Sequence, residues 1–193
     1  WVLLHCLAFS IVGMTVWVQL WKICQLRKVK NILRNPPIGR SENIGFKTLE
    51  VRTEKELRAS FLNQPLMPHI GAKLSAISPR KACIEVAYEK SITQQHGLFH
   101  GGISGAIADN AAGFAAMTLM GKDKEPLTIE FKINFLNIAD GERLIAEAEI
   151  LQGGRSIFHG ESKVYTIKNE NKILTASALV TIKATSKVSE TLF

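Results

Sequence analysis

The chain has 193 residues and a formal net charge of +7 at pH 7, from 24 basic and 17 acidic side chains. Five of the basic residues lie within the first 35 positions, which hold no acidic residue, so the other 19 nearly balance the acidic ones. This balance argues against a nucleic-acid-binding surface, and the scattered Cys6, Cys24 and Cys83 argue against a disulfide framework or a cysteine-based metal site.

The first 21 residues carry no charged side chain. As a helix they would extend about 30 Å, which matches the hydrocarbon core of a bilayer. Trp17 and Trp21 suit a membrane interface, and the basic residues from Lys22 onward suit its cytoplasmic side. Residues 1–24 are therefore predicted to form a transmembrane anchor, with the rest of the chain in the cytoplasm.

Three other interpretations of this segment compete with an anchor. A cleaved signal peptide is disfavoured because basic residues follow the apolar run and no small-residue cleavage site is evident. A buried core helix would be unusually long. The chain also begins with Trp1 and not with methionine, so a misassigned start would leave a soluble cytoplasmic protein.

Residues 25–45 are predicted to form a basic juxtamembrane segment and a linker, because Pro36 and Pro37 stop any helix. The main domain is expected over residues 46–186, with a tail over residues 187–193. Early in this domain, the sequence from Thr53 to Glu56 has the pattern of a helix cap before an apolar run. A short helix is expected there, covering one end of the domain.

Two strands are predicted next, over residues 72–77 and 83–88, with a turn between them. The longest apolar stretch of the domain is Ile103–Met120, whose many alanines suit a central helix held closely by a sheet. An exposed loop at Gly121–Pro126 is expected to end that helix.

Four more strands are predicted, over residues 128–136, 143–151, 156–167 and 172–183. The first alternates apolar and polar side chains, which is typical of a half-buried strand. One helix and one antiparallel sheet must bury each other's apolar faces. The order of elements therefore predicts an α+β fold, in which an antiparallel six-stranded sheet wraps around one long central helix, preceded by the N-terminal membrane helix.

The start of the central segment carries the most specific pattern of the chain. His100, Gly101 and Gly102 are expected to form a sharp turn before the helix, with bare backbone N–H groups that can face a ligand. Such groups, with the helix dipole, can stabilise an oxyanion or a carbonyl oxygen. Asp109 follows seven residues after Gly102, on the same helix face and among apolar neighbours, where a carboxylate needs a partner or a task.

The sequence HGGISGAIADNAAGFAA resembles the signature of hotdog-fold acyl-CoA thioesterases of the phenylacetic-acid-degradation (PaaI) type. The resemblance runs from about His69 to Ala184 and implies a hotdog fold and acyl-CoA hydrolysis. It implies that Gly101 or Gly102 polarises the thioester carbonyl and that Asp109 is the catalytic carboxylate. It also implies a homodimer or dimer of dimers, in which Asp109 faces the glycine turn of the partner subunit, and no cofactor beyond the coenzyme A of the substrate.

The resemblance gives further residues a role. His100 shapes the turn or hydrogen-bonds near the thioester, Thr128 orients the water, and the turn at Gly153, Gly154 and Arg155 lies near the coenzyme A arm. An ordinary structural role is the alternative for each of these residues. Many relatives have an asparagine six residues before the histidine of this motif, and that asparagine assists the nucleophile. This chain has Gln94 there, whose longer side chain changes the reach of the amide and with it this assisting role.

No metal is expected, because His96 and His100 lie four residues apart in a glycine-rich loop without a clear third ligand. Two alternative functions remain. A hotdog dehydratase or hydratase would use a histidine as acid and base in a different loop, and no such motif is found. A hotdog protein that binds acyl-CoA without turnover is kept open by Gln94.

Overall fold

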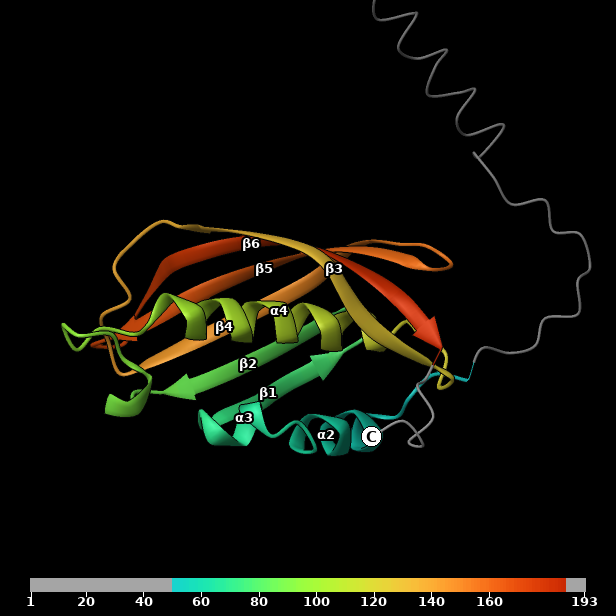
Figure 1. Ribbon diagram of the computed structural model, residues 1–193, viewed down its shortest axis with the longest axis horizontal. Coiled ribbons are helices and arrows are strands. Elements are labelled where there is room, and N and C mark those ends of the chain that lie inside the picture. Colours follow the sequence, from blue (N-terminus) through green and yellow to red (C-terminus); the bar gives the residue numbers. More distant parts are fainter. Residues whose placement is uncertain (1–49, 187–193) are drawn as a thin grey trace, which may run out of the picture. The chain divides into compact units, whose positions relative to one another are not determined.

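The computed structural model describes residues 50–186. These residues form one antiparallel six-stranded sheet that curls around a long helix, with two short helices at one side (Figure 1). The elements in chain order are α2 (Glu54–Leu62), α3 (Leu66–His69), β1 (Ala72–Ser78), β2 (Lys81–Ala87), the 3-10 turn η1 (Lys90–Ile92), α4 (Gly101–Met117), β3 (Lys124–Phe135), β4 (Arg143–Gly153), β5 (Ile157–Lys168) and β6 (Asn171–Ser186).

The strand order across the sheet is β1-β2-β4-β5-β6-β3, and every neighbouring pair is antiparallel. The strand that follows α4 in the chain thus lies at the far edge, paired only with β6. Its other edge has backbone groups that no described strand pairs. β1 forms the opposite edge, next to the short helices α2 and α3 (Figure 1).

Helix α4 fills the concave side of the sheet and is buried on most of its circumference. Its alanines at positions 108, 111, 112, 115 and 116 are fully buried, which lets the strands approach the helix backbone closely. β5 approaches through Gly160, where an added Cβ would lie 3.2 Å from Ile150 and 3.8 Å from Ala112. The predicted α+β arrangement of six antiparallel strands around a central helix is confirmed.

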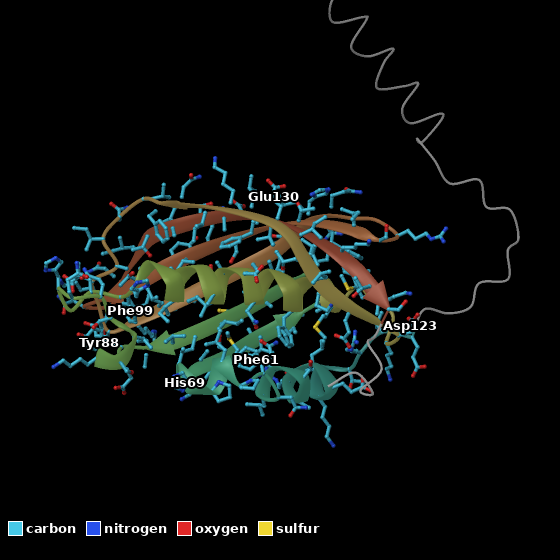
Figure 2. All side chains as sticks on the ribbon, viewed as in Figure 1. Phe61, His69, Tyr88, Phe99, Asp123 and Glu130 are labelled. Atoms are coloured by element: carbon cyan, nitrogen blue, oxygen red, sulfur yellow. The ribbon has the colours of Figure 1, made fainter. Side chains whose placement is uncertain are left out.

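Two aromatic contacts hold α2 and the loop before α4 in position (Figure 2). Phe61 of α2 packs edge-on against Phe114 of α4, with ring centroids 5.5 Å apart. Tyr88 packs edge-on against Phe99 at the same distance, and its hydroxyl donates to the Gly97 carbonyl at 3.0 Å. The second contact holds the loop before α4 against the end of β2.

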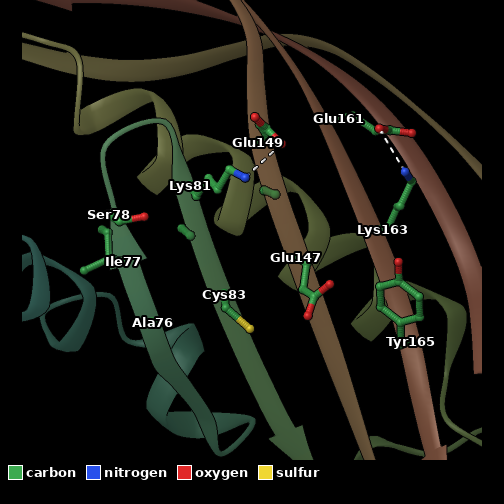
Figure 3. A pocket seen from close by; sticks show the side chains of 12 residues that line it. Ala76, Ile77, Ser78, Lys81, Cys83, Glu147, Glu149, Glu161, Lys163 and Tyr165 are labelled. Carbon is green, nitrogen blue, oxygen red and sulfur yellow. Dashed lines mark ion pairs between the residues drawn. The ribbon is translucent and has the colours of Figure 1, made fainter. Parts of the chain in front are cut away.

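The outer face of the sheet, which points away from α4, is polar. A shallow hollow of about 410 Å³ lies there, over β2, β4 and β5 (Figure 3). Its charges are paired, because Lys81 lies 3.4 Å from Glu149 and Lys163 lies 3.3 Å from Glu161. Burial raises the pKa of the Cys83 thiol in the same hollow, which favours its protonated form.

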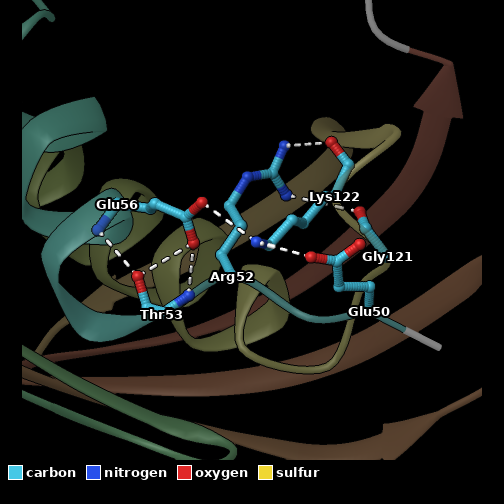
Figure 4. Close-up of polar contacts among 6 residues, drawn as sticks. All are labelled: Glu50, Arg52, Thr53, Glu56, Gly121 and Lys122. Atoms are coloured by element: carbon cyan, nitrogen blue, oxygen red, sulfur yellow. Dashed lines mark hydrogen bonds and ion pairs between the residues drawn. The ribbon is translucent and has the colours of Figure 1, made fainter. Parts of the chain in front are cut away.

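Polar contacts tie the segment before α2 to the loop that leads into β3 (Figure 4), and one further ion pair ties it to β3 itself. The nearly buried Arg52 guanidinium pairs with the Glu125 carboxylate at 2.6 Å. Lys122 pairs with Glu50 at 2.9 Å and with Glu56 at 3.1 Å. The hydrogen bonds to Glu50 and Glu56 raise the pKa of Lys122. These ion pairs hold the start of α2 in place, so that α2 packs against α4 through Phe61.

The predicted short helix begins where the cap pattern placed it. The Thr53 hydroxyl accepts from the Glu56 backbone N–H, and the Glu56 carboxylate accepts from the Thr53 backbone N–H, which is a complete capping box. The predicted strands match β1, β2, β4, β5 and β6 to within a few residues. Tyr88, which the prediction places at the end of the second strand, lies just after β2 and is 40% exposed.

Two predictions around β3 are wrong. Gly121–Pro126 is not a loop throughout, because β3 already begins at Lys124; a proline is tolerated here since β3 is an edge strand. β3 is also less buried than its alternation suggested. Ile129 is 54% exposed, Phe131 41% and Phe135 58%, because no other described strand covers this edge.

The predicted anchor over residues 1–24, the linker and the tail lie outside the described residues and stay predictions. Within residues 50–186, no helix is both long enough and apolar enough to cross a membrane.

Candidate active site

The His-Gly-Gly motif lies at the start of α4, and its geometry differs from the expected turn. Gly101 and Gly102 form the first turn of the helix itself, while His100 is the extended N-cap residue. The Gly102 N–H donates to the His100 Nδ1 at 2.9 Å, and the Ile103 N–H donates to the His100 carbonyl at 2.9 Å. Among the described residues, the Gly101 N–H has no acceptor, so it is the free donor at this helix end.

The glycines of α4 allow β3 to lie close to the helix. A Cβ on Gly101 would lie 3.1 Å from the Phe135 ring, and one on Gly105 would lie 3.5 Å from the Phe131 ring. Asp109 continues this row, since residues four apart share a helix face. The row therefore places the start of the helix, a glycine and a carboxylate along the face that packs against this strand.

Asp109 is partly buried and has one described hydrogen-bond partner. The Thr128 hydroxyl of β3 donates to Asp109 Oδ1 at 2.8 Å. Both side chains line a hollow of about 310 Å³ between α2, α4 and β3. The structure thus brings together two residues of the predicted site that lie 19 positions apart in the chain.

The structure does not bring Asp109 near the start of α4 of the same chain. Eight residues separate Gly101 from Asp109, and at 1.5 Å of rise per residue they lie about 12 Å apart along the helix. One small carbonyl group cannot contact both. Within one chain, the described residues therefore give two half-sites: a free N–H at the helix start, and a carboxylate with its threonine.

Gln94 lies in the loop that precedes α4. Its side-chain carbonyl accepts from the His96 backbone N–H at 2.6 Å, and its backbone N–H donates to the Leu98 carbonyl at 2.8 Å. The amide therefore closes the loop that leads to His100 and makes no contact with Asp109. Within residues 50–186, no cluster of three or more potential metal ligands occurs.

The turn at residues 153–156 is a tight hairpin between β4 and β5. The Gly154 N–H donates to the Ile157 carbonyl at 2.8 Å, and Arg155 is exposed. An added Cβ on Gly153 would lie 3.5 Å from Leu119, just beyond the C-terminal end of α4. In one chain this turn is thus at the opposite end of α4 from the glycine motif.

Sequence reasoning missed two polar residues of the Asp109 hollow. Asn110 of α4 donates to Gln64 Oε1 at 2.7 Å, and both line the hollow. A polar residue next to Asp109 in an otherwise apolar helix was a usable signal for Asn110. Nothing local indicates Gln64, which lies 46 positions away.

Comparisons with known proteins identify the family of the chain. A model of the thioesterase superfamily matches residues 96–172. The chain is 25% identical over 122 residues to a 1,4-dihydroxy-2-naphthoyl-CoA hydrolase of Listeria monocytogenes, a match that covers 63% of this chain and 98% of that protein.

Two solved structures are also similar to this chain. A thioesterase family protein from Silicibacter pomeroyi is 34% identical, with a TM-score of 0.67 and coverage of 69% of this chain and 98% of that one. A mutant of the phenylacetic acid degradation protein PaaI from Thermus thermophilus, 21% identical, shares the fold with a TM-score of 0.54 over 62% of this chain and 97% of its own. The chain therefore belongs to the thioesterase superfamily, as a hotdog-fold thioester hydrolase.

Proposed function

We propose that the protein hydrolyses acyl-CoA thioesters to a free acid and coenzyme A, with Asp109 as general base or nucleophile. The observation that supports this most is the 2.8 Å hydrogen bond from the Thr128 hydroxyl to Asp109 Oδ1, at the edge of a hollow large enough for an acyl group. With one carboxylate oxygen held, the other is available to take a proton from water or to attack the thioester carbonyl.

The grip on the carbonyl is assigned to the first turn of α4. Because the Gly102 N–H is already bonded to His100, the free Gly101 N–H is the donor of choice for the developing oxyanion. The positive end of the helix dipole adds to this stabilisation. His100 then acts by fixing the turn, and Gln94 by fixing the loop before it.

The complete site requires a second copy of the chain. The two half-sites of one chain lie about 12 Å apart, while the free edge of β3 presents Phe131 and Phe135, 41% and 58% exposed. Antiparallel pairing of two β3 edges about a twofold axis would run the two α4 helices in opposite directions. Asp109 of one protomer would then face the start of α4 in its partner, in a homodimer or dimer of dimers.

The exposed Arg155 of the β4–β5 turn is proposed to pair with a phosphate of coenzyme A. No cofactor beyond the substrate is invoked, so treatment with a chelator should leave turnover unchanged. Activity that disappears with EDTA and returns with a divalent metal would contradict this part of the proposal.

A panel of acyl-CoAs with a thiol-trapping dye tests the proposed function. Hydrolysis releases free coenzyme A, whereas a dehydratase or a protein that only binds acyl-CoA releases none. Binding of several acyl-CoAs without release of coenzyme A from any of them would overturn the proposal.

Mixed oligomers test the two-chain site. Asp109→Asn and Gly102→Val chains, each inactive alone, should regain activity when combined, because a mixed dimer contains one intact site. Gly102→Val acts by displacing His100, whose Nδ1 would lie 2.9 Å from the new Cβ. Mixed dimers that form, as shown by mass spectrometry of differently tagged chains, but stay inactive would contradict it.

A further inference from the structure

Asn110 holds an unused hydrogen-bond acceptor beside the proposed active site. Its Nδ2 donates to Gln64 Oε1 at 2.7 Å, which fixes the orientation of the amide. Its Oδ1 is buried and has no hydrogen-bond partner among the described residues. Buried polar atoms are nearly always paired, so an unpaired one beside a cavity calls for a partner that enters that cavity.

The cavity in question is the Asp109 hollow of about 310 Å³, which Asn110 also lines. Phe114 and Met117 contribute to its apolar lining. Its polar lining consists of Ser60, Gln64, Asp109, Asn110, Glu125 and Thr128. This volume lies at the lower end of the range for small-molecule sites. An acyl group whose thioester carbonyl lies at Asp109 would therefore extend past Asn110.

The free atoms of the amide pair define the chemistry of the missing partner. Asn110 Oδ1 can act only as a hydrogen-bond acceptor. The Gln64 amide nitrogen can act only as a donor, and it makes no hydrogen bond to a described residue. A hydroxyl group both donates and accepts, so it satisfies the pair. Of the two carboxylates in the same hollow, Glu125 is paired with Arg52 at 2.6 Å, and Asp109 accepts from the Thr128 hydroxyl.

We propose that Asn110, oriented by Gln64, recognises a hydroxyl group on the acyl part of the substrate and makes the enzyme selective for hydroxyacyl thioesters. The proposal rests on acyl-CoA hydrolysis at Asp109. A substrate without the hydroxyl leaves Asn110 Oδ1 unpaired in the complex, which weakens its binding and turnover. Asn110 acts on selectivity, and Asp109 acts on the reaction itself.

The test compares octanoyl-CoA with its 3-, 5- and 8-hydroxy derivatives, which differ from it only by the hydroxyl and sample its distance from the carbonyl. For the wild-type chain, kcat/KM for at least one derivative should exceed that for octanoyl-CoA by about tenfold or more. Asn110→Leu should bring this ratio close to one, because the hydroxyl group then has no polar partner at this position. Asn110→Ala gives the same readout if leucine disturbs the packing of α4.

Asn63→Leu is the matched control, since Asn63 is an exposed amide next to Gln64 that does not line the hollow. This variant should keep the wild-type ratio. A ratio near one in the wild type, or an equal ratio in the wild type and both Asn110 variants, would overturn the proposal and leave the Asn110 oxygen paired with bound water. If no member of the series is hydrolysed, the proposed function fails. In that case calorimetry tests the selectivity separately. It gives the dissociation constants of octanoyl-CoA and of its hydroxy derivatives for the wild type and the same variants, and their ratio replaces the ratio of kcat/KM.

Discussion

Thr128→Val tests the hydrogen bond on which the proposed mechanism depends. Valine has nearly the shape of threonine and suits a β-strand equally well, so the change removes little except the hydroxyl that donates to Asp109 Oδ1 at 2.8 Å. A hydrogen bond to a charged group contributes about 1.5–3 kcal/mol. If all of this orients the carboxylate for the reaction, kcat falls by about 10- to 150-fold.

The assay is steady-state release of coenzyme A from the acyl-CoA that the wild type turns over fastest. Thr128→Ser is the matched control, because it keeps the hydroxyl and should stay close to wild-type kcat. Thermal melting of both variants shows whether the fold is intact. A folded Thr128→Val chain with wild-type kcat would refute the role assigned to this hydrogen bond.

Three further substitutions test the fold by denaturant unfolding. Gly141→Ala should destabilise the domain by about 1–3 kcal/mol, because the new Cβ would collide with the Ile167 carbonyl oxygen. Gly113→Ala in α4 places a Cβ that meets no atom within 4 Å, so it should stabilise the domain by up to about 1 kcal/mol. Equal effects on the free energy of unfolding at both positions would contradict this packing. The backbone hydrogen bond from Thr53 lowers the pKa of Glu56 from 4.5 to about 2, so its stabilising effect is present above pH 4.5 and is lost as the pH falls towards 2. The stability difference between wild type and Glu56→Gln should shrink over that range, and a constant difference would contradict the assigned cause.

The parts of the fold that the sequence predicts best are those set by local signals. The capping box at Thr53 needs only residues three positions apart, and the alanine-rich run of α4 reflects a helix surrounded by strands. β2 and β5 alternate fully buried and more exposed side chains, because one face of each strand is buried against α4. These patterns were sufficient to predict both the element order and the wrapped sheet.

β3 was predicted less well, because its environment depends on the whole sheet. Alternating Ile129, Phe131 and Phe135 indicate a buried face, but β3 lies at an edge whose other side no described strand covers. The same residues are explained if a second copy of the chain covers them, as proposed above. Burial in an oligomer cannot be distinguished from burial within a chain by periodicity alone.

The candidate site was predictable as residue types and only partly as contacts. The spacing from Gly102 to Asp109 indicated a shared helix face, but the bond from the Gly102 N–H to His100 depends on a side-chain rotamer. The pair of Asn110 and Gln64 joins α4 to the loop after α2, and such a contact follows only from the packed structure.

The most direct test of the central claim is the turnover number of Asp109→Asn on the best acyl-CoA substrate, measured on the folded, purified full chain. Asp123→Asn is the control, since Asp123 is an exposed carboxylate in the loop before β3. The account predicts that Asp109→Asn lowers kcat by about 100-fold or more, as for the loss of a general base or nucleophile, while Asp123→Asn keeps it. A folded Asp109→Asn chain that retains more than about half of wild-type kcat would contradict the account, because loss of such a group costs far more.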